Sequence, residues 1–425
     1  MKIKVKEKSF SEIAALSPYQ RKKPKYQNLF WRTLLRIVSA PDLRATHFSC
    51  ERVGMERLGK REPALFLMNH SSFIDLKIAA TVLYPRPFNI VCTTDGFVGK
   101  HYLMRSLGCI PTNKFVADLA LVRDMRYCFQ KLKSSVLMFP EAGYSLDGTP
   151  TRLPDSLGKC AKMMGVPVVM IRTEGAFARQ PLYNQLHRRE VNVSAKMEYL
   201  LSAEDLKEKS AEEIGEIIQN AFQFDAFRWQ WENKIRIDEP DRADYLNRLL
   251  YKCPACHAEG KTDGAGTTLT CHACGKQWEL DEYGLMRAAD GKSEFPHVPD
   301  WMSWERECVR KELLDGTYRL DTDVDIYVFC DGKCMYHIGE GHLTHTKDGF
   351  HLTDARGELD YTHRPTATYT LNADYNWYEL GDVISFGTNA ITYYCLPKGG
   401  KDLVTKARLA TEEIYTLLQQ EKVVK

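Results

Sequence analysis

The sequence contains no run of about 18 or more apolar residues, the length that a helix needs to cross a bilayer, so no transmembrane helix is expected. The N-terminus also lacks the apolar core of a secretory signal, because basic residues recur through Arg36. Charge of one sign is not in excess, since the formal net charge of the 425 residues is only +2. These absences argue against an integral membrane protein and a general polyanion binder, and they predict a cytoplasmic protein.

The regular cysteine pairs of a disulfide scaffold are missing as well. The thirteen cysteines are an odd number, and most are scattered through apolar segments. This distribution indicates reduced thiols in a cytosol. With 44% hydrophobic and 27% charged residues, the composition is ordinary for a soluble globular protein of two or three domains.

The small net charge hides an uneven distribution at the N-terminus. Residues 1–36 contain ten Lys or Arg but only two acidic residues, Glu7 and Glu12. Such a basic arm favours an anionic partner surface, and a solvated, partly disordered tail is the alternative. Nucleic acid is not the expected partner, because the later segment 236–290 is not notably basic.

Residues 26–41 predict a short amphipathic helix. Its apolar side chains share one face at helical spacing, and Arg32, Arg36 and Ser39 line the other; the apolar set is Phe30, Leu34, Ile37 and Val38. Asn28 is the expected N-cap and Pro41 the expected stop. Basic flanks and an apolar face favour a helix in the membrane interface, so residues 1–41 are predicted to contact an anionic membrane surface. The alternative is that the apolar face packs on the following domain.

Short apolar runs alternate with helical patterns between about residues 60 and 200. The predicted strands are 64–68, 88–92, 136–139, 166–171 and 191–197, and the predicted helices are 72–83, 117–133 and 155–164. One more helix is expected over 202–222. Alternation of this kind predicts an α/β domain with a mainly parallel sheet flanked by helices.

A titratable pair follows the first of these strands. His70 comes directly after the apolar run 64–68, and Asp75 follows five residues later. Parallel strands deliver functional residues at their carboxyl ends, and Ser71 or Ser72 is the expected cap of the next helix, which places Asp75 in its first turn. An aspartate bonded to one imidazole nitrogen leaves the other free to act as a base. The alternative is an Asp–His hydrogen bond that serves structure alone.

Two later motifs favour the catalytic interpretation. The segments NHSSFID (69–75), FPEAGYS (139–145) and GVPVV (165–169), in this order, resemble the glycerolipid acyltransferase family, which contains 1-acylglycerol-3-phosphate and other lysophospholipid acyltransferases. The resemblance covers roughly residues 45–200. It implies an O-acyltransferase that moves a fatty acyl group from an acyl-CoA or acyl carrier protein thioester to a hydroxyl of a lysolipid acceptor. His70 would be the general base, and Asp75 would orient it.

The resemblance also implies an acceptor site. Its expected residues are Asn69, Thr112, Asn113, Lys114, Glu141, Gly143, Tyr144 and Ser145. Two of them depart from the family pattern, because Lys114 and Tyr144 stand where the family usually has arginine. Arginine grips a phosphate dianion with two parallel hydrogen bonds, so the departures favour a lysolipid with a less charged or diester head group. Arg152 and Arg172 are alternative sources of the missing charge.

Four cysteines form the one group that is not scattered. Two Cys-x-x-Cys pairs are separated by fourteen residues, a spacing typical of a closed tetrahedral zinc site; the predicted ligands are Cys253, Cys256, Cys271 and Cys274. Two disulfides are the alternative. His257 and His272 lie beside the pairs and are expected outside the coordination sphere. A closed site has no open position for substrate, so the zinc ribbon is predicted to be structural.

The remainder of the chain predicts an antiparallel β domain. From about residue 300, short alternating runs are separated by turns, with a hairpin signal at Asp331-Gly332 and a last helix over 402–421. A β-sandwich or barrel closed by that helix is expected, similar in outline to pleckstrin-homology-like domains. The predicted division is 1–44 for the basic arm and interfacial helix, 45–235 for the acyltransferase domain, 236–290 for the zinc ribbon and 291–425 for the β domain.

Together these patterns predict a peripheral acyltransferase of phospholipid biosynthesis or remodelling, bound at the cytoplasmic face of a membrane. A protein of another class is the alternative: a catalytically degenerate lipid-binding scaffold that uses the zinc ribbon and the β domain for partner contacts. An acyl-transfer assay with and without His70 distinguishes the two.

Overall fold

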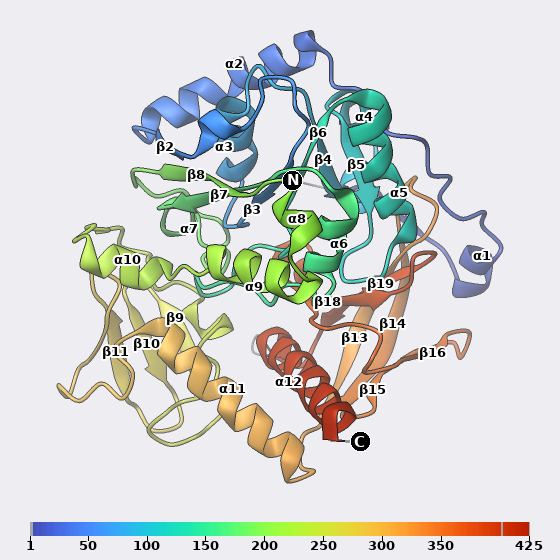
Figure 1. Ribbon diagram of the computed structural model, residues 1–425. Coiled ribbons are helices and arrows are strands. Elements are labelled where there is room, and N and C mark those ends of the chain that lie inside the picture. The colour runs from blue at the N-terminus through green and yellow to red at the C-terminus, as the bar shows by residue number, and fades with distance from the viewer. Residues whose placement is uncertain (1–2, 401–402, 425) are drawn as a thin grey trace.

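Three β-sheets organise the computed structural model, which describes residues 3–400 and 403–424 (Figure 1). A seven-stranded sheet in the N-terminal half lies above two others in the view of Figure 1. A four-stranded sheet with the cysteine pairs and an eight-stranded sheet near the C-terminus lie beneath it.

The seven-stranded sheet confirms the predicted, mainly parallel arrangement. Its order is β2-β8-β7-β3-β6-β4-β5, and every neighbouring pair is parallel except β7 with β8. The strands are β2 (Ser49–Val53), β3 (Leu65–Met68), β4 (Phe88–Thr93), β5 (Cys109–Thr112), β6 (Ser135–Met138), β7 (Val168–Glu174) and β8 (Ser194–Leu201).

Helices cover both faces of this sheet because its central strands are apolar on both sides. In β3, Phe66 and Met68 join the core beneath α2 and α3, whereas Leu65 and Leu67 join the core beneath α5, α6 and α9. The helices are α2 (Leu29–Ala45), α3 (Ile74–Val82), α4 (His101–Ser106), α5 (Leu119–Tyr127), α6 (Leu157–Met164), α7 (Ala176–Arg179), α8 (Asp205–Glu208), α9 (Ala211–Ala221) and α10 (Ala226–Glu232).

The prediction of one helix over 202–222 is wrong. The chain forms the short helix α8, leaves helical geometry at Lys209, and starts α9 after Ser210. Ser210 accepts a hydrogen bond from the Glu213 backbone, and the Glu213 carboxylate accepts one from the Ser210 backbone. This capping box is a stronger start signal than the Ser202–Asp205 pair ahead of α8, so the helix divides there.

Helix α2 begins at its predicted cap, Asn28, but continues past Pro41 to Ala45. The last turn is held from outside the helix, because Asp42 forms ion pairs with Lys77 and Arg179 and Leu43 is buried. These tertiary contacts offset the backbone hydrogen bond that proline cannot donate.

The apolar face of α2 does not pack on the following domain. Phe30, Ile37 and Val38 are 65%, 62% and 59% exposed, whereas Arg32 and Ser39 on the opposite face are buried. The helix is therefore amphipathic with its apolar side outward, the reverse of an ordinary surface helix. Within residues 3–400 and 403–424, no helix has the length and apolarity to span a membrane.

Glycine at 158 allows α6 and α9 to touch. A Cβ built on Gly158 would contact the Ala211 carbonyl oxygen and lie 2.6 Å from the Gly215 backbone nitrogen, whereas one built on Gly215 would have no neighbour nearer than 4.0 Å. We expect Gly158→Ala to lower the free energy of unfolding by about 1–3 kcal/mol, because the helices must separate. Gly215→Ala, the matched control, should be neutral or stabilise slightly through helix propensity. Urea denaturation of both variants tests this, and equal stabilities would contradict it.

The cysteine-rich sheet has the order β12-β11-β10-β9, with all neighbours antiparallel. Its strands are β9 (Thr262–Ala265), β10 (Thr268–Cys271), β11 (Gln277–Leu280) and β12 (Met286–Ala288). Trp278 of β11 is fully buried and lies edge-on to Trp301 of α11 (Val298–Leu314), with ring centroids 5.0 Å apart. Through α11 this sheet and the C-terminal sheet share one hydrophobic core.

The C-terminal sheet is an antiparallel meander whose last strand returns to the first. Its order is β16-β15-β14-β13-β19-β18-β17, so it is open between β16 and β17. The strands are β13 (Leu320–Phe329), β14 (Met335–Thr346), β15 (Gly349–Asp354), β16 (Asp360–His363), β17 (Asn372–Trp377), β18 (Gly381–Gly387) and β19 (Thr392–Pro397). The hairpin predicted at Asp331-Gly332 joins β13 to β14, and α12 (Leu403–Val424) packs on β17, β18 and α11.

The N-terminal arm is part of this last sheet. Strand β1 (Val5–Glu7) pairs in parallel with β14, placing Val5 opposite Met335 and Glu7 opposite His337. The short helix α1 (Phe10–Ala14) follows, and its Ile13 is buried in the C-terminal core. Further along, the Tyr19 backbone N–H donates to the Cys330 carbonyl. Residues 5–19 therefore lie on the C-terminal domain, unlike a solvated tail.

Candidate functional site

The predicted functional side chains gather at one edge of the seven-stranded sheet. His70 follows β3, Thr112 ends β5 and Glu141 follows β6; Asp95, which the sequence did not single out, follows β4 at the same edge. These strands are parallel to one another, so their carboxyl ends meet at the same edge.

His70 and Asp75 are in contact at this edge. The Nδ1 atom of His70 lies 2.9 Å from Oδ2 of Asp75, which is fully buried in the first turn of α3. The His70 side chain keeps 24% of its surface exposed. A carboxylate next to Nδ1 favours the tautomer with the proton there, so Nε2 carries the lone pair. The arrangement is suited to accepting a proton at Nε2.

The aspartate is itself fixed by the backbone of the preceding turn. Its Oδ2 atom accepts hydrogen bonds from the N–H groups of Ser71, at 2.7 Å, and Ser72, at 3.0 Å. Neither serine caps α3 with its side chain, as the sequence had indicated; the Ser72 hydroxyl donates to the Ala176 carbonyl instead. The carboxylate takes over the capping function, which holds Asp75 in one rotamer beneath the imidazole.

Glu141 holds two loops together. One carboxylate oxygen accepts the His70 backbone N–H and the other accepts the Thr151 backbone N–H, both at 2.7 Å. Burial raises the pKa of Glu141 to about 7, although the two N–H donors and Arg408 oppose that shift. Because both oxygens are engaged, the side chain positions the histidine loop from behind.

The loop after Glu141 turns at Ala142. Ala142 has the left-handed φ of 54°, whereas a Cβ on Gly143 would meet nothing within 4 Å, so the turn does not depend on the glycine. Ser145 donates its backbone N–H to the His70 carbonyl at 2.8 Å, and its hydroxyl donates to the Thr149 carbonyl. The motif FPEAGYS therefore supports the His70 loop through hydrogen bonds to the His70 backbone.

Aromatic rings enclose the imidazole. The centroids of Phe139 and Tyr144 each lie 4.3 Å from that of His70, and Phe73 lies edge-on to Tyr144. Tyr144 thus contacts the catalytic candidate directly, at the position where the family pattern has arginine. Asn69 is buried, and its Oδ1 accepts the Thr173 backbone N–H at 2.8 Å, which joins the ends of β3 and β7.

A comparison with protein families matches this part of the chain. Residues 50–173 fit the family model described as Acyltransferase. The chain contains an acyltransferase domain. A crystal structure of the 1-acyl-sn-glycerophosphate (LPA) acyltransferase PlsC from Thermotoga maritima is also similar, with 17% identity over 48% of this chain and 80% of that chain and a TM-score of 0.35. A likeness at that level adds no argument to the family match. No curated protein matches the chain.

The C-terminal domain covers the same edge of the acyltransferase domain. Asn113 donates to the carbonyls of Thr388 and Asn389, and Lys114 donates to Oδ1 of Asn372 at 3.0 Å. Thr112 turns away, since its hydroxyl donates to Asp118. The sequence had assigned residues 112–114 to the acceptor, and it had no signal for this contact, because the partners lie more than 250 residues further along the chain.

Carboxylates and phenols of the C-terminal domain extend the site. The hydroxyl of Tyr378 donates to Oδ2 of Asp95, at 3.4 Å. Burial raises the pKa of Asp374 to about 6, against the opposing effect of the Lys114 ammonium. Burial also raises the pKa of Tyr144, and the nearby charges of Asp75 and Asp374 add to that shift. Asp374 therefore lies within electrostatic range of the tyrosine that covers His70.

The arginines expected as alternatives are engaged elsewhere. Arg152 donates to the Thr416 hydroxyl of α12 at 2.7 Å, and Arg172 pairs with Glu174 at 3.6 Å. Arg408 of α12, which the sequence did not single out, donates to the Thr151 hydroxyl and pairs with Glu412. Each of these cations already faces a protein acceptor, so none is placed as a free phosphate clamp.

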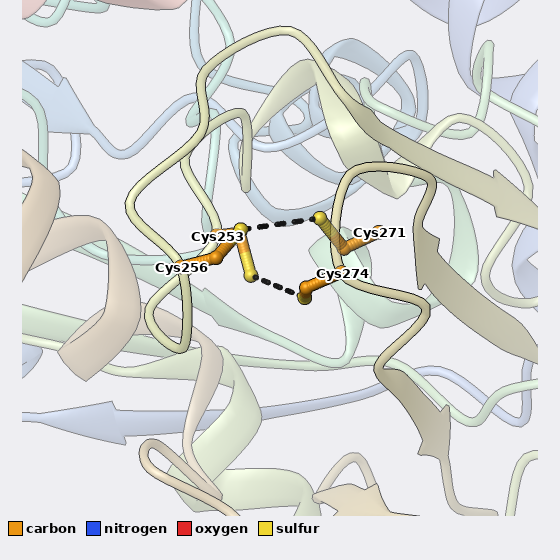
Figure 2. A group of neighbouring side chains, drawn as sticks. All are labelled: Cys253, Cys256, Cys271 and Cys274. Carbon is orange, nitrogen blue, oxygen red and sulfur yellow. Dashed lines mark hydrogen bonds between the residues drawn. The ribbon is translucent and has the colours of Figure 1, made fainter.

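The four cysteines predicted as metal ligands form a separate centre. All thirteen cysteines are free thiols, which excludes the two disulfides. Figure 2 shows four of them turned toward one another, and their sulfurs lie within 4.8 Å of each other: Cys253, Cys256, Cys271 and Cys274. Two sulfur pairs are 3.8 and 3.7 Å apart. A tetrahedron with zinc–sulfur bonds of about 2.3 Å has an edge of about 3.8 Å, so the donor set and its size fit a metal ion.

Proposed function

We propose that this protein is an O-acyltransferase that moves a fatty acyl group from a thioester to a free hydroxyl of a lysophospholipid. The contact of His70 Nδ1 with Asp75 carries the proposal, because it prepares Nε2 as a base inside a segment that matches the acyltransferase family.

The reaction follows from the free Nε2 atom. His70 takes the proton of the acceptor hydroxyl as its oxygen forms a bond to the thioester carbonyl carbon. The carbon–sulfur bond then breaks, and the departing thiolate receives the proton from the imidazolium. Asp75 stabilises the positive imidazole between the two steps. No covalent acyl-enzyme is needed, because the substrate hydroxyl is the nucleophile.

The site favours an acceptor that carries little negative charge. A phosphate monoester approaches a charge of −2 near pH 7, whereas a phosphodiester keeps −1. The carboxyl group of Asp374 lies at this site, and Lys114 already faces Asp374 and Asn372. We therefore propose a lysolipid with a diester head group as the acceptor, with the C-terminal domain forming part of the head-group wall.

Asp374→Asn should weaken this preference. At a charge separation of about 10 Å and an effective dielectric of about 20, removing one charge would change the energy of each extra substrate charge by about 1.7 kcal/mol. The ratio of kcat/KM for a diester lysolipid over lysophosphatidic acid is expected to fall about tenfold at pH 8. Asp360→Asn, at an exposed carboxylate of the same domain, is the control. If the ratio were unchanged in Asp374→Asn, the proposal that Asp374 lies next to the head group would be refuted.

Within the predicted membrane-binding segment 1–41, the part from Arg21 through α2 is proposed to bring the protein to an anionic membrane, because residues 5–19 lie on the C-terminal domain. The outward apolar face of α2 supports this, since Phe30, Ile37 and Val38 can enter the lipid while the surrounding Lys and Arg contact phosphates. We also propose that the protein lies in the cytoplasm, at the cytoplasmic face of the membrane. Residues 236–290 are proposed to form a zinc ribbon whose metal ion is structural.

The deciding experiment is an acyl-transfer assay with purified full-length protein and a panel of lysolipids. Acyl-CoA and acyl carrier protein thioesters serve as alternative donors, and release of the free thiol is measured. We expect turnover of lysophosphatidylethanolamine or lysophosphatidylglycerol above that of lysophosphatidic acid. Much faster acylation of lysophosphatidic acid would refute the head-group proposal. Lysolipid binding without turnover for any donor would refute the enzyme and favour the scaffold.

A further inference from the structure

A cavity opens at the opposite edge of the seven-stranded sheet from His70. Its volume is about 910 Å³, within the range of small-ligand sites. Phe66 at the start of β3 and Ser135 at the start of β6 contribute to its wall. Since the carboxyl ends of these strands carry His70 and Glu141, the cavity is separated from the proposed reaction centre by the length of the sheet.

The wall of this cavity combines an apolar base with a cationic rim. Met55, Pro63, Tyr84 and Leu132 line the cavity with partly exposed side chains, above the buried Phe66 and Met197. Five cations and a single carboxylate, that of Glu62, surround the opening among the lining residues; the cations are Arg52, Lys60, Arg61, Arg86 and Lys133. An apolar base beneath a positive rim complements an amphiphile with an anionic head group.

Some cations of the rim have partners in the protein, and three have none among the described residues. Arg52 and Arg86 are used in the fold, because Arg52 donates to the Val82 carbonyl and Arg86 to the Gly59 carbonyl. In the part of the chain that the structure describes, the side chains of Lys60, Arg61 and Lys133 have neither a hydrogen bond nor an ion pair. Three like charges around one opening repel each other, and an anion between them would relieve that repulsion.

Helix α2 lies behind the wall of the same cavity, since it contacts the lining residue Tyr84. Tyr26, just ahead of the helix, lines it, and the Arg36 guanidinium lies 4.5 Å from the centroid of Tyr84, another lining residue. The Thr33 hydroxyl lies 3.5 Å from that of Tyr84. Polar residues of α2 therefore contact the wall of the cavity, and the same helix carries the exposed Phe30, Ile37 and Val38 that are proposed to enter lipid.

We propose that this cavity binds an anionic phospholipid of the membrane, with its phosphate between Lys60, Arg61 and Lys133 and part of one acyl chain over Met55 and Leu132. The site is distinct from the acceptor site and carries out no reaction. It would hold the protein on anionic lipid by a specific contact, in addition to the insertion of α2. The inference does not depend on acyl transfer, because it concerns residues at the other edge of the sheet.

A soluble lipid separates this site from the interfacial helix. Dihexanoyl phosphatidylglycerol, kept below its micelle concentration, is titrated into the full-length protein by isothermal calorimetry, beside dihexanoyl phosphatidylcholine and inorganic phosphate. Wild type is expected to bind the anionic lipid, and the triple variant K60Q/R61Q/K133Q to bind it at least tenfold more weakly. Affinity should also fall as salt rises, because the rim is exposed.

The control variant K311Q/K347Q/R356Q removes the same number of Lys and Arg from exposed positions of the C-terminal domain. It should bind like wild type. Equal affinity for the phosphatidylcholine, or an unaffected triple variant, would overturn the proposal. Binding of inorganic phosphate as tight as that of the lipid would also overturn it, since the ligand would then be a free anion. These outcomes are independent of whether the protein acylates any lysolipid.

Discussion

Replacing His70 by alanine is expected to lower kcat/KM for acyl transfer by about 10³-fold or more, with little change in the free energy of unfolding. The imidazole supplies the base, and general-base catalysis contributes about 10²–10⁴-fold. The ring is partly exposed, and the hydrogen bonds of the loop are made by the His70 backbone, which alanine keeps. Steady-state release of thiol and urea denaturation measure the two quantities on the same preparation.

The chain offers a matched control for this variant. His187 forms the same kind of contact with an aspartate, with its Nδ1 atom 2.6 Å from Oδ2 of Asp241, but it lies at the surface away from the strand ends. His187→Ala should keep full activity. Wild-type turnover in His70→Ala would refute the catalytic assignment, and equal losses in both variants would show that the effect is not specific to the site.

The variant Asp75→Asn tests the role of Asp75 in orienting His70, apart from the role of His70 as the base. Asparagine can still accept the N–H groups of Ser71 and Ser72 through its amide oxygen, but it no longer stabilises the positive imidazole. We expect kcat to fall by about 10²–10⁴-fold with a smaller change in KM, as for a buried aspartate that orients a catalytic histidine. A raised KM with unchanged kcat would mean that Asp75 shapes the acceptor site alone.

Removing the metal should have the largest effect on stability. We expect about one zinc per chain by mass spectrometry, and a fall of roughly 10 °C or more in Tm after chelation, because thiolate–zinc binding is a large part of the folding free energy of such units. The loss should spread beyond the cysteine-rich sheet, since that sheet shares its core with the C-terminal sheet. If the protein contained no metal and chelation left its Tm unchanged, the proposed zinc site would be refuted.

Serine variants make this test specific. Cys274 is exposed, so Cys274→Ser should cost little apart from the loss of one metal ligand, yet Tm is expected to fall as it does after chelation. Cys50→Ser, at a half-buried thiol on β2, is the control and should leave Tm nearly unchanged. A small effect of Cys274→Ser beside a large effect of chelation would indicate that the metal sits elsewhere.

Local features of the sequence predicted the elements that carry the site. The strand before His70 and the paired cysteines follow from periodicity and spacing within a short stretch of chain, whereas the role of His70 and Asp75 was indicated only by the resemblance of the motifs at 69–75, 139–145 and 165–169 to an acyltransferase family. The seven-stranded sheet and the position of His70 at a strand end followed from the same patterns.

Contacts between distant segments could not be predicted in this way. No local pattern links Lys114 to Asn372, which lies far along the chain. The segment Val5–Glu7 is too short for its sequence to predict a strand, and it becomes one by pairing with β14. Pro41 shows the same limit within a helix, because the ion pairs of Asp42 outweigh a local stop signal.

The pairing of β1 with β14 has a consequence for synthesis. Glu7 leaves the ribosome about 330 residues before His337, to which its carboxylate is bonded in the finished protein. The acyltransferase domain can fold on the growing chain, because its sheet uses only strands made early, but the first strand must wait for nearly the whole chain. The nascent protein therefore carries an unpaired basic segment beside an outward apolar helix, and completion of the C-terminal sheet withdraws the first part of that segment from other partners.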